Sequence, residues 1–330
     1  MGLTLLRLWL NRLLLFILAG TFVVVAIYAP TGKVIVKQTE QRQGNIRYTM
    51  TEFRWDFATY RQHLAQYITD LRTGHLRLVG PKSSTDTYNA REANLPQILR
   101  PGQEQDFLPL LKDGWLASLE LFAVAVVLSA LLGVAVGAVV ALRGRLFHNT
   151  VLGLAVLALC LADFFVVVLL QFAVPWIYRH TGIQVAYVLA GPGSFKGWVM
   201  PVIGLCLAPA AYGAQLTINA LDEVMREEYI RTARSKGVPE RLVVMKHAFK
   251  NVALRLLAGY PPILNVVLTS AIVVERMTVW PGLTKWFFGY GDMPMATVAV
   301  CYVAWYLVLD GLAASARVWA GKAAGQEVAA

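Results

Sequence analysis

Six long apolar runs, almost free of charged side chains, constrain the fold of this chain more than any other feature. A helix needs roughly 20 apolar residues to cross a bilayer. The runs cover residues 13–32, 121–142, 148–178, 197–221, 256–274 and 293–316. They predict an all-α polytopic membrane protein with six transmembrane helices.

The overall composition excludes several other classes of protein. Hydrophobic residues make up 57% of the 330 residues and charged residues only 15%, whereas an ordinary soluble domain is about 25% charged. Disorder, a coiled coil and a collagen are therefore excluded. The net charge of +10 lies in short blocks between the apolar runs. This pattern favours a lipid bilayer as the partner surface and predicts no nucleic acid partner.

The basic residues in the short loops predict the orientation of the helices. Fourteen Lys and Arg fall on the side that holds both termini, and four fall on the opposite side. Because positively charged loops stay in the cytoplasm, we expect both termini inside (N-in/C-in). The long segment 31–113 does not enter this comparison, since long loops cross largely regardless of charge.

These boundaries divide the chain into four parts. Residues 1–30 form the cytoplasmic N-terminus and the first helix, which we interpret as a retained anchor and not a cleaved signal peptide. Residues 31–113 form a sizeable external segment. Residues 114–320 hold helices two to six, with a cytoplasmic loop at 221–255, and residues 321–330 form a cytoplasmic tail.

The external segment has the pattern of a folded element. Its apolar residues recur at helical spacing: Trp55, Phe57, Tyr60, Leu64, Tyr67, Ile68 and Leu71. Residues 33–48 alternate weakly, which is compatible with a short strand or a hairpin. Residues 81–89 are rich in Ser, Thr and Asp and indicate a turn or loop.

The chain lacks the motifs of an enzyme. It has no HExxH, no GxSxG and no usable phosphate loop, because the nearest match, at 74–83, has the wrong spacing and a blocking Pro81. Its cysteines, Cys160, Cys206 and Cys301, have no CxxC or Cys/His spacing and are expected to be small core residues. We therefore expect no catalytic residue, no metal site and no cofactor bound by this chain. Any ATP and Mg²⁺ would bind to another polypeptide.

Two carboxylates lie inside the apolar runs. Asp163 is near the middle of the third run and Asp310 lies toward the cytoplasmic end of the sixth. A charged group in a membrane is costly and suggests function, so both are candidates for a translocation path or a proton relay. The alternative is that each caps or pairs within the helix bundle.

The cytoplasmic loop at 221–255 carries the most informative pattern. Acidic residues begin the stretch 222–239 and basic residues end it, an order that complements the dipole of a helix. Gly237 and Pro239 follow as expected for a helix terminus. One predicted face holds Met225, Tyr229, Thr232, Ala233 and Lys236. The small residues Ala233 and Gly237 would allow close approach of a docked cytosolic protein.

This loop resembles the EAA-loop region of bacterial ABC importer permeases, in the dipeptide/oligopeptide/nickel branch. The resemblance rests on EYIRTARSKG at 228–237 and on HAFKN at 247–251. Further similar segments follow in the family's order: LEL at 119–121, Pro201 and Pro209, VERMTVWPGL at 274–283, and the aromatic segment 55–79.

The resemblance implies a type I importer architecture in a bacterial inner membrane. A coupling helix would contact the ATPase through Glu228, Tyr229, Arg231, Thr232, Ala233, Arg234, Lys236 and Gly237. Trp280, Pro281, Gly282 and Leu283 would form an external turn beneath the docked binding protein. The implied partners are a second homologous permease, two ABC ATPase subunits or domains, and an extracytoplasmic substrate-binding protein. The external segment is similar to that of the first of the two permeases.

The sequence also departs from the family's pattern. Asp163 replaces a proline in the third run, and Arg255 replaces a proline after the coupling loop. Peptide import is the first interpretation, and nickel or a metal chelate is the alternative cargo. A proton-coupled secondary transporter using Asp163 and Asp310 is the alternative of another class, although no inverted repeat is visible. A membrane hydrolase would need a nucleophile and a base that the sequence lacks.

Overall fold

The computed structural model describes residues 2–43, 46–79, 104–141, 143, 145–161, 163–188, 191–237, 239, 242–243, 248–287 and 291–323. The chain forms two compact units. The first unit comprises Met1–Leu13, Gly114–Lys285 and Trp305–Ala330, and the second comprises Leu14–Asp113 and Trp286–Ala304. The predicted tail is described only as far as residue 323.

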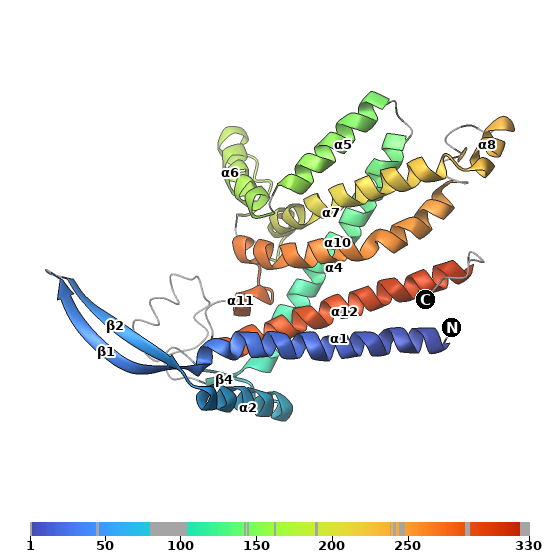
Figure 1. Cartoon of the computed structure of the whole chain (residues 1–330). Helices are drawn as coiled ribbons and strands as arrows, with labels where there is room; N and C mark the ends of the chain where they lie inside the picture. The colour runs from blue at the N-terminus through green and yellow to red at the C-terminus, as the bar shows by residue number, and fades with distance from the viewer. Residues whose placement is uncertain are drawn as a thin grey trace. The chain divides into compact units, whose positions relative to one another are not determined.

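Long apolar helices dominate the structure, as predicted (Figure 1). Within the described residues, five are long and apolar enough to cross a membrane: α1 (Gly2–Tyr28), α4 (Phe107–Ala141), α6 (Asp163–Thr181), α7 (Phe195–Val224) and α12 (Asp292–Ala323). α10 (Phe249–Thr278) occupies the fifth predicted run. The helical membrane core is confirmed, whereas the number of spans and their orientation stay predictions.

The third apolar run is not one helix, so that prediction is wrong. α5 (Arg145–Cys160) ends inside the run, and α6 begins at Asp163. The carboxylate is therefore in the first turn of a helix, where the helix dipole favours a negative charge. Hydropathy gave no sign of this break because the residues on both sides of it are apolar.

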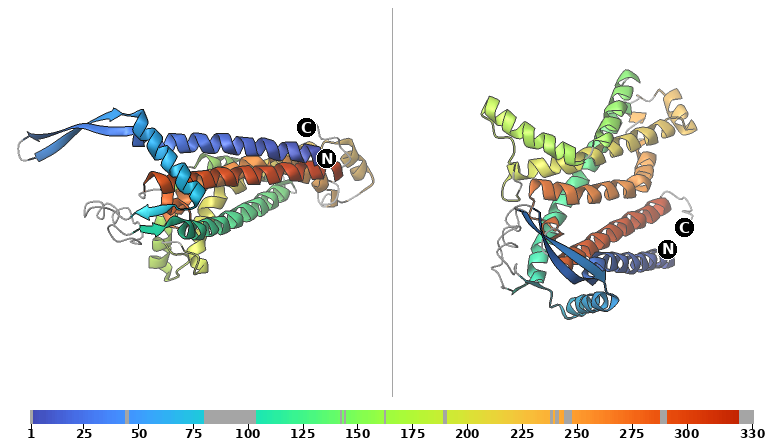
Figure 2. Two further views of the ribbon diagram at one scale, coloured as in Figure 1. Left: turned by 90° about the horizontal axis from the view of Figure 1, so that it is seen from below. Right: turned by 60° about the vertical axis from the view of Figure 1, so that its left-hand side comes forward.

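Small residues let α4 approach α7 closely. A Cβ atom on Gly133 would be 3.0 Å from the Ala210 carbonyl oxygen, and one on Gly137 would be 2.5 Å from the Thr217 Cβ atom. Glycine four residues apart is a common device for tight packing of membrane helices. On another side, α7 lies next to α10 along much of its length, as the further views show (Figure 2).

The second unit contains a β-hairpin beyond the first helix. A short 3-10 turn (Ala29–Gly32) leads into β1 (Lys33–Gln43), which pairs antiparallel with β2 (Ile46–Trp55). The hairpin extends past the weakly alternating residues 33–48. Trp55 ends the second strand and donates from Nε1 to the Ala29 carbonyl at 3.0 Å, so its predicted place in a helix is wrong.

α2 (Phe57–Thr73) follows the hairpin and has clear signals at both ends. Asp56 accepts hydrogen bonds from the Thr59 hydroxyl and backbone, and the hydroxyl bond in particular lowers the pKa of Asp56. Gly74 ends the helix in the left-handed region, with φ of 74°. Such a conformation strains residues that carry a Cβ.

Only part of the predicted apolar face of α2 is buried. Tyr60 and Tyr67 are buried, whereas Phe57, Ile68 and Leu71 are exposed. The Tyr67 hydroxyl lies 3.2 Å from the Thr297 hydroxyl, and burial raises the pKa of Tyr67. Two short strands, β3 (Arg77–Val79) and β4 (Glu104–Asp106), then pair antiparallel. The loop predicted at 81–89 lies outside the described residues.

Candidate functional site

The segment for which the sequence predicts a coupling helix forms α8 (Glu228–Ser235), a short helix beyond the end of α7. Glu227 is its N-cap residue, with extended backbone angles. Gly237 follows the helix with φ of 73°, and a Cβ on it would meet no atom within 4 Å. The predicted terminus at Gly237 is therefore confirmed, but the helix starts several residues later than the charge pattern indicated.

One side of α8 is buried against the rest of the first unit. Ile230 is fully buried and Ala233 is 8% exposed. They pack in a cluster that also holds residues from the end of α7, from the segment before α10 and from the start of α10: Ala220, Leu221, Val224, Val243, Ala248 and Val252. This cluster fixes the helix against the protein by burying apolar surface.

The burial of α8 corrects the predicted partner face. Ala233 contacts the chain's own core, so it does not offer a small residue to a docked protein. The exposed residues of this segment are instead mostly polar or charged: Glu228, Tyr229, Arg231, Thr232, Arg234, Lys236 and Gly237. Met225 lies before α8, in the link from α7, so it does not share a helical face with Tyr229.

Polar contacts also hold α8 to α10. The Arg255 guanidinium pairs with Glu223 through Nη1, and its Nη2 lies 2.9 Å from a Glu227 carboxylate oxygen. One turn away on α10, the Asn251 amide donates to the Tyr229 hydroxyl at 2.8 Å. The sequence marked Arg255 only as a departure from a family pattern and gave no sign of its two partners.

The second predicted site, at Trp280–Leu283, is a tightly packed turn between α10 and the short α11 (Thr284–Phe287). Trp280 is 2% exposed, and its Nε1 donates to the Ala117 carbonyl at 3.0 Å. Its ring packs edge-on against Trp198. The Leu283 backbone N–H donates to the Ser118 hydroxyl at 2.7 Å. Pro281 is partly buried and Gly282 is buried.

Glu275, in the last turn of α10, contacts this turn, and the sequence gave it no predicted role. It is 2% exposed and accepts a hydrogen bond from the Thr284 backbone N–H at 3.1 Å. A Cβ on Gly282 would lie 2.5 Å from the Glu275 carboxylate, so a larger residue there would displace that carboxylate. The only sign of this role in the sequence was the position of Glu275 beside an apolar run, because a carboxylate buried there needs a hydrogen-bond partner.

The two intramembrane carboxylates each have a partner. The Ser270 hydroxyl of α10 donates to Asp163 at 2.5 Å. Arg12 of α1 donates to Asp310 from Nη2 at 2.7 Å and from Nε at 3.1 Å. Pairing within the bundle was the alternative that the sequence left open, and the observed contacts agree with it. The structure also moves Asp163 from the predicted middle of a span to the start of α6.

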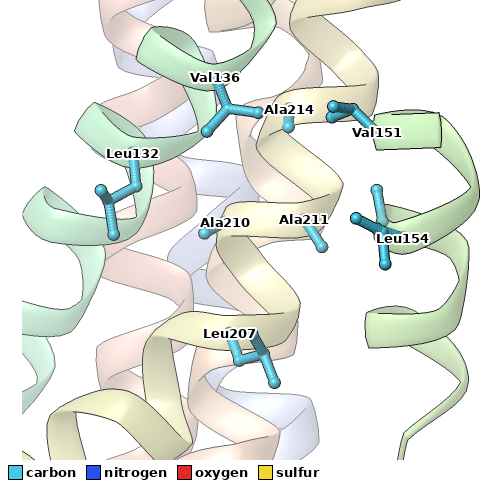
Figure 3. A pocket seen from close by; sticks show the side chains of 9 residues that line it. Leu132, Val136, Val151, Leu154, Leu207, Ala210, Ala211 and Ala214 are labelled. Atoms are coloured by element: carbon cyan, nitrogen blue, oxygen red, sulfur yellow. The ribbon is translucent and has the colours of Figure 1, made fainter. Parts of the chain in front are cut away.

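Two cavities differ sharply in the chemistry they offer. In the first unit, a cavity of about 280 Å³ lies between α4, α5 and α7 and is lined by aliphatic side chains (Figure 3): Leu132, Val136, Val151, Leu154, Ala155, Leu207, Ala210, Ala211 and Ala214. In the second unit, a cleft of about 540 Å³ includes His63, Gln66, Asp70, His75 and Arg77. The first is unsuited to a charged peptide because it offers no partner to the peptide's termini.

No cluster of three His, Cys, Asp or Glu side chains able to hold a metal occurs in the part of the chain that the structure describes. The cysteines are free and differ in burial. Cys206 is buried as predicted, Cys301 is partly buried, and Cys160 is exposed, which corrects its prediction as a core residue.

Comparison with known proteins adds to this geometry. Residues 129–315, more than half of the chain, match the family described as the binding-protein-dependent transport system inner membrane component. The chain belongs to this family. The match contains α8, the Trp280 turn and both intramembrane carboxylates. As an inner membrane component with several apolar helices, the chain is a multi-pass membrane protein.

Individual members of the family carry names that specify cargo. The chain is 30% identical to the dipeptide transport system permease protein DppB of Bacillus subtilis, over 58% of this chain and 60% of that protein. It is 28% identical to the di/tripeptide transport system permease protein DppB of Pseudomonas aeruginosa, over 67% and 73% of the two chains. It is 31% identical to the oligopeptide transport system permease protein OppB of Escherichia coli, over 54% and 57%. The chain thus spans about three fifths of the first and third of these relatives.

Proposed function

We propose that this chain is a permease subunit of an ATP-driven importer that moves di- and oligopeptides delivered by an external binding protein. The observation that carries the proposal is α8, a short helix with a buried apolar side and an exposed polar side, located in the segment between two long helices. The peptide cargo rests on the names of the relatives, all three of which are peptide transport permeases.

In the proposed mechanism, separate ATPase subunits bind and hydrolyse ATP, and this chain supplies the path and the surface on which they act. Closure of the ATPases would displace α8, and the attached helices would alternate between outward and inward states. The bias between the two states must come from contacts that differ between them. The second permease and the pair of ATPase subunits belong to this proposal.

Alternative functions gain less support. A proton-coupled transporter would use Asp163 and Asp310 as relay groups, but Asp310 is paired with an arginine and Asp163 with a serine hydroxyl. A nickel or metal-chelate cargo has no relative among the three whose name specifies a metal. Transport by the isolated chain in a proton gradient, without ATPase, would favour the proton-coupled alternative.

We expect Gly237→Trp to weaken ATPase binding strongly. Gly237 is exposed beside α8 and open to solvent, so the indole would project into the proposed interface. The positive φ adds strain of roughly 1 kcal/mol for a residue with a Cβ. Co-purification of the ATPase subunits with the tagged permease should fall about tenfold or more, which corresponds to about 1.4 kcal/mol.

The matched control is Gly237→Asn, because asparagine tolerates the left-handed region and adds little bulk. Membrane yield should be unchanged for both variants. Undiminished ATPase binding by Gly237→Trp would refute the assignment of α8 as the coupling helix.

We expect Asp163→Asn to reduce uptake of peptides that carry a free ammonium group. The change removes the charge but keeps an oxygen that can accept the bond from Ser270. We propose that Asp163 lines the path, where its charge would attract the peptide N-terminus. Uptake of radiolabelled dipeptide into proteoliposomes should fall several-fold, whereas Ser270→Ala, which keeps the charge, should have a smaller effect. Equal uptake by Asp163→Asn and the native chain would leave Asp163 with a structural role only.

A further inference from the structure

The link between α7 and α8 is short and lies between two carboxylates. α7 ends at Val224 and α8 begins at Glu228, so three residues separate the helices. Glu223 lies before the link, in the last turn of α7, and Glu227 lies at its end as the N-cap of α8. The Glu227 side chain makes no capping hydrogen bond to α8. It is therefore available to another partner.

Arg255 reaches both sides of this link from α10. Its Nη1 pairs with Glu223 and its Nη2 pairs with Glu227. A planar guanidinium presents its donors in a rigid fork. The two carboxylates are therefore held in a fixed relation to each other, and this relation defines how α8 leaves α7.

A second polar contact joins α10 to α8, one turn away from Arg255 along α10. Asn251 and Arg255 are four residues apart, so they lie on the same face of α10. Asn251 donates to the Tyr229 hydroxyl, in the first turn of α8. One face of α10 thus holds the start of α8 at two points.

These polar contacts are not what keeps α8 folded onto the protein. The Arg255 and Glu227 side chains are each 39% exposed, and Glu223 is 68% exposed. Pairs this exposed to solvent contribute little to net stability. The buried cluster around Ile230 therefore attaches α8 to the protein. Arg255 instead determines the angle at which α8 leaves α7.

We propose that Arg255 is a positioning residue that sets the angle between α7 and α8 and transmits displacement of α8 to α10. This inference rests on the proposed function of α8 as the coupling helix. Without the guanidinium, α8 stays attached through its apolar side but pivots at the three-residue link. A displacement of α8 is then partly taken up by rotation at that link, and less of it reaches α10.

A distance measurement on the full-length permease tests the angle directly. Spin labels are placed at Asn219 on α7 and Ser235 on α8, both exposed, in a background in which the three native cysteines are replaced by serine. The native arginine should give one narrow distance distribution in nanodiscs. Arg255→Ala should broaden or shift it. Arg255→Lys should give an intermediate result, because an ammonium group lacks the fork.

Two controls separate this role from a general loss of charge or of fold. Arg226→Ala removes the same charge from the link itself and should leave the distribution narrow. Added salt should broaden the native distribution, since partly exposed pairs are screened, and should have little effect on Arg255→Ala. A distribution that does not change in Arg255→Ala would overturn the proposal.

The complete transporter supplies the functional readout. Arg255→Ala should retain ATPase subunits at the native level but move several-fold less peptide per ATP hydrolysed. Full coupling in this variant would contradict transmission through Arg255. Failure of the native chain to bind any ATPase would instead refute the proposed function, and the distance measurement would still decide whether Arg255 sets the angle.

Discussion

Gly137→Leu is expected to destabilise the packed core by roughly 3 kcal/mol, at the upper end of the usual cost of overpacking. A Cβ at this position would already lie 2.5 Å from Thr217 Cβ and 3.2 Å from the Ala214 carbonyl. The obstructing atoms include backbone of α7, so no side-chain rotation relieves the clash. α4 and α7 must separate, and their close contact is lost. Thermal unfolding in detergent should show a Tm lower by several degrees.

Gly153→Leu is the matched control for that change. Gly153 is also a helical glycine in an apolar segment, but a Cβ there meets no atom within 4 Å. It should leave the Tm close to that of the native chain. If Gly137→Leu were as stable as Gly153→Leu, the close approach of α4 and α7 would be wrong.

Glu275→Ala is expected to destabilise the Trp280 turn by roughly 2 kcal/mol, because it leaves a buried backbone donor without its partner. The Thr284 N–H loses its acceptor, and a cavity opens beside Gly282. The turn should become accessible, so amide exchange at residues 280–284 should accelerate by about an order of magnitude or more. Uptake should fall as well if the turn lies beneath the docked binding protein.

Val273→Ala provides the comparison, since Val273 is 38% exposed on the same helix. It truncates a side chain near the turn without removing a buried acceptor. Slow exchange at Thr284 in Glu275→Ala, equal to that in Val273→Ala, would show that the carboxylate does not hold the turn.

Much of the helical framework was predictable because the apolar runs are long and their ends are charged. α7, α10 and α12 each cover the run predicted for them, α1 ends four residues before its run does, and α4 begins well before its run. The break between α5 and α6 was not predictable from hydropathy, since both halves are apolar. The sequence pattern predicted only part of the hairpin. In the structure the second strand continues to Trp55, through residues that do not alternate clearly between apolar and polar.

The end of α8 could be predicted from the sequence, but its buried face could not. The charge order and Gly237 located its end, because caps are local signals. The predicted face was wrong because it continued one helical phase from Met225 to Lys236, whereas Met225 lies in the link before α8 and Ala233 is buried. The residues that cover Ile230, such as Val243 and Val252, come from a later segment, and their contacts depend on tertiary structure.

α10 connects the two candidate sites without interruption. Its first turns carry Asn251 and Arg255 beside α8, and its last turn carries Glu275 beside the Trp280 turn. Thirty helical residues span about 45 Å. If the two ends are energetically linked through this helix, the coupling free energy is the same in both directions. An ATPase bound at α8 that changes the affinity of the Trp280 turn for another protein would then have its own affinity for α8 changed by the same factor when that protein binds at the turn.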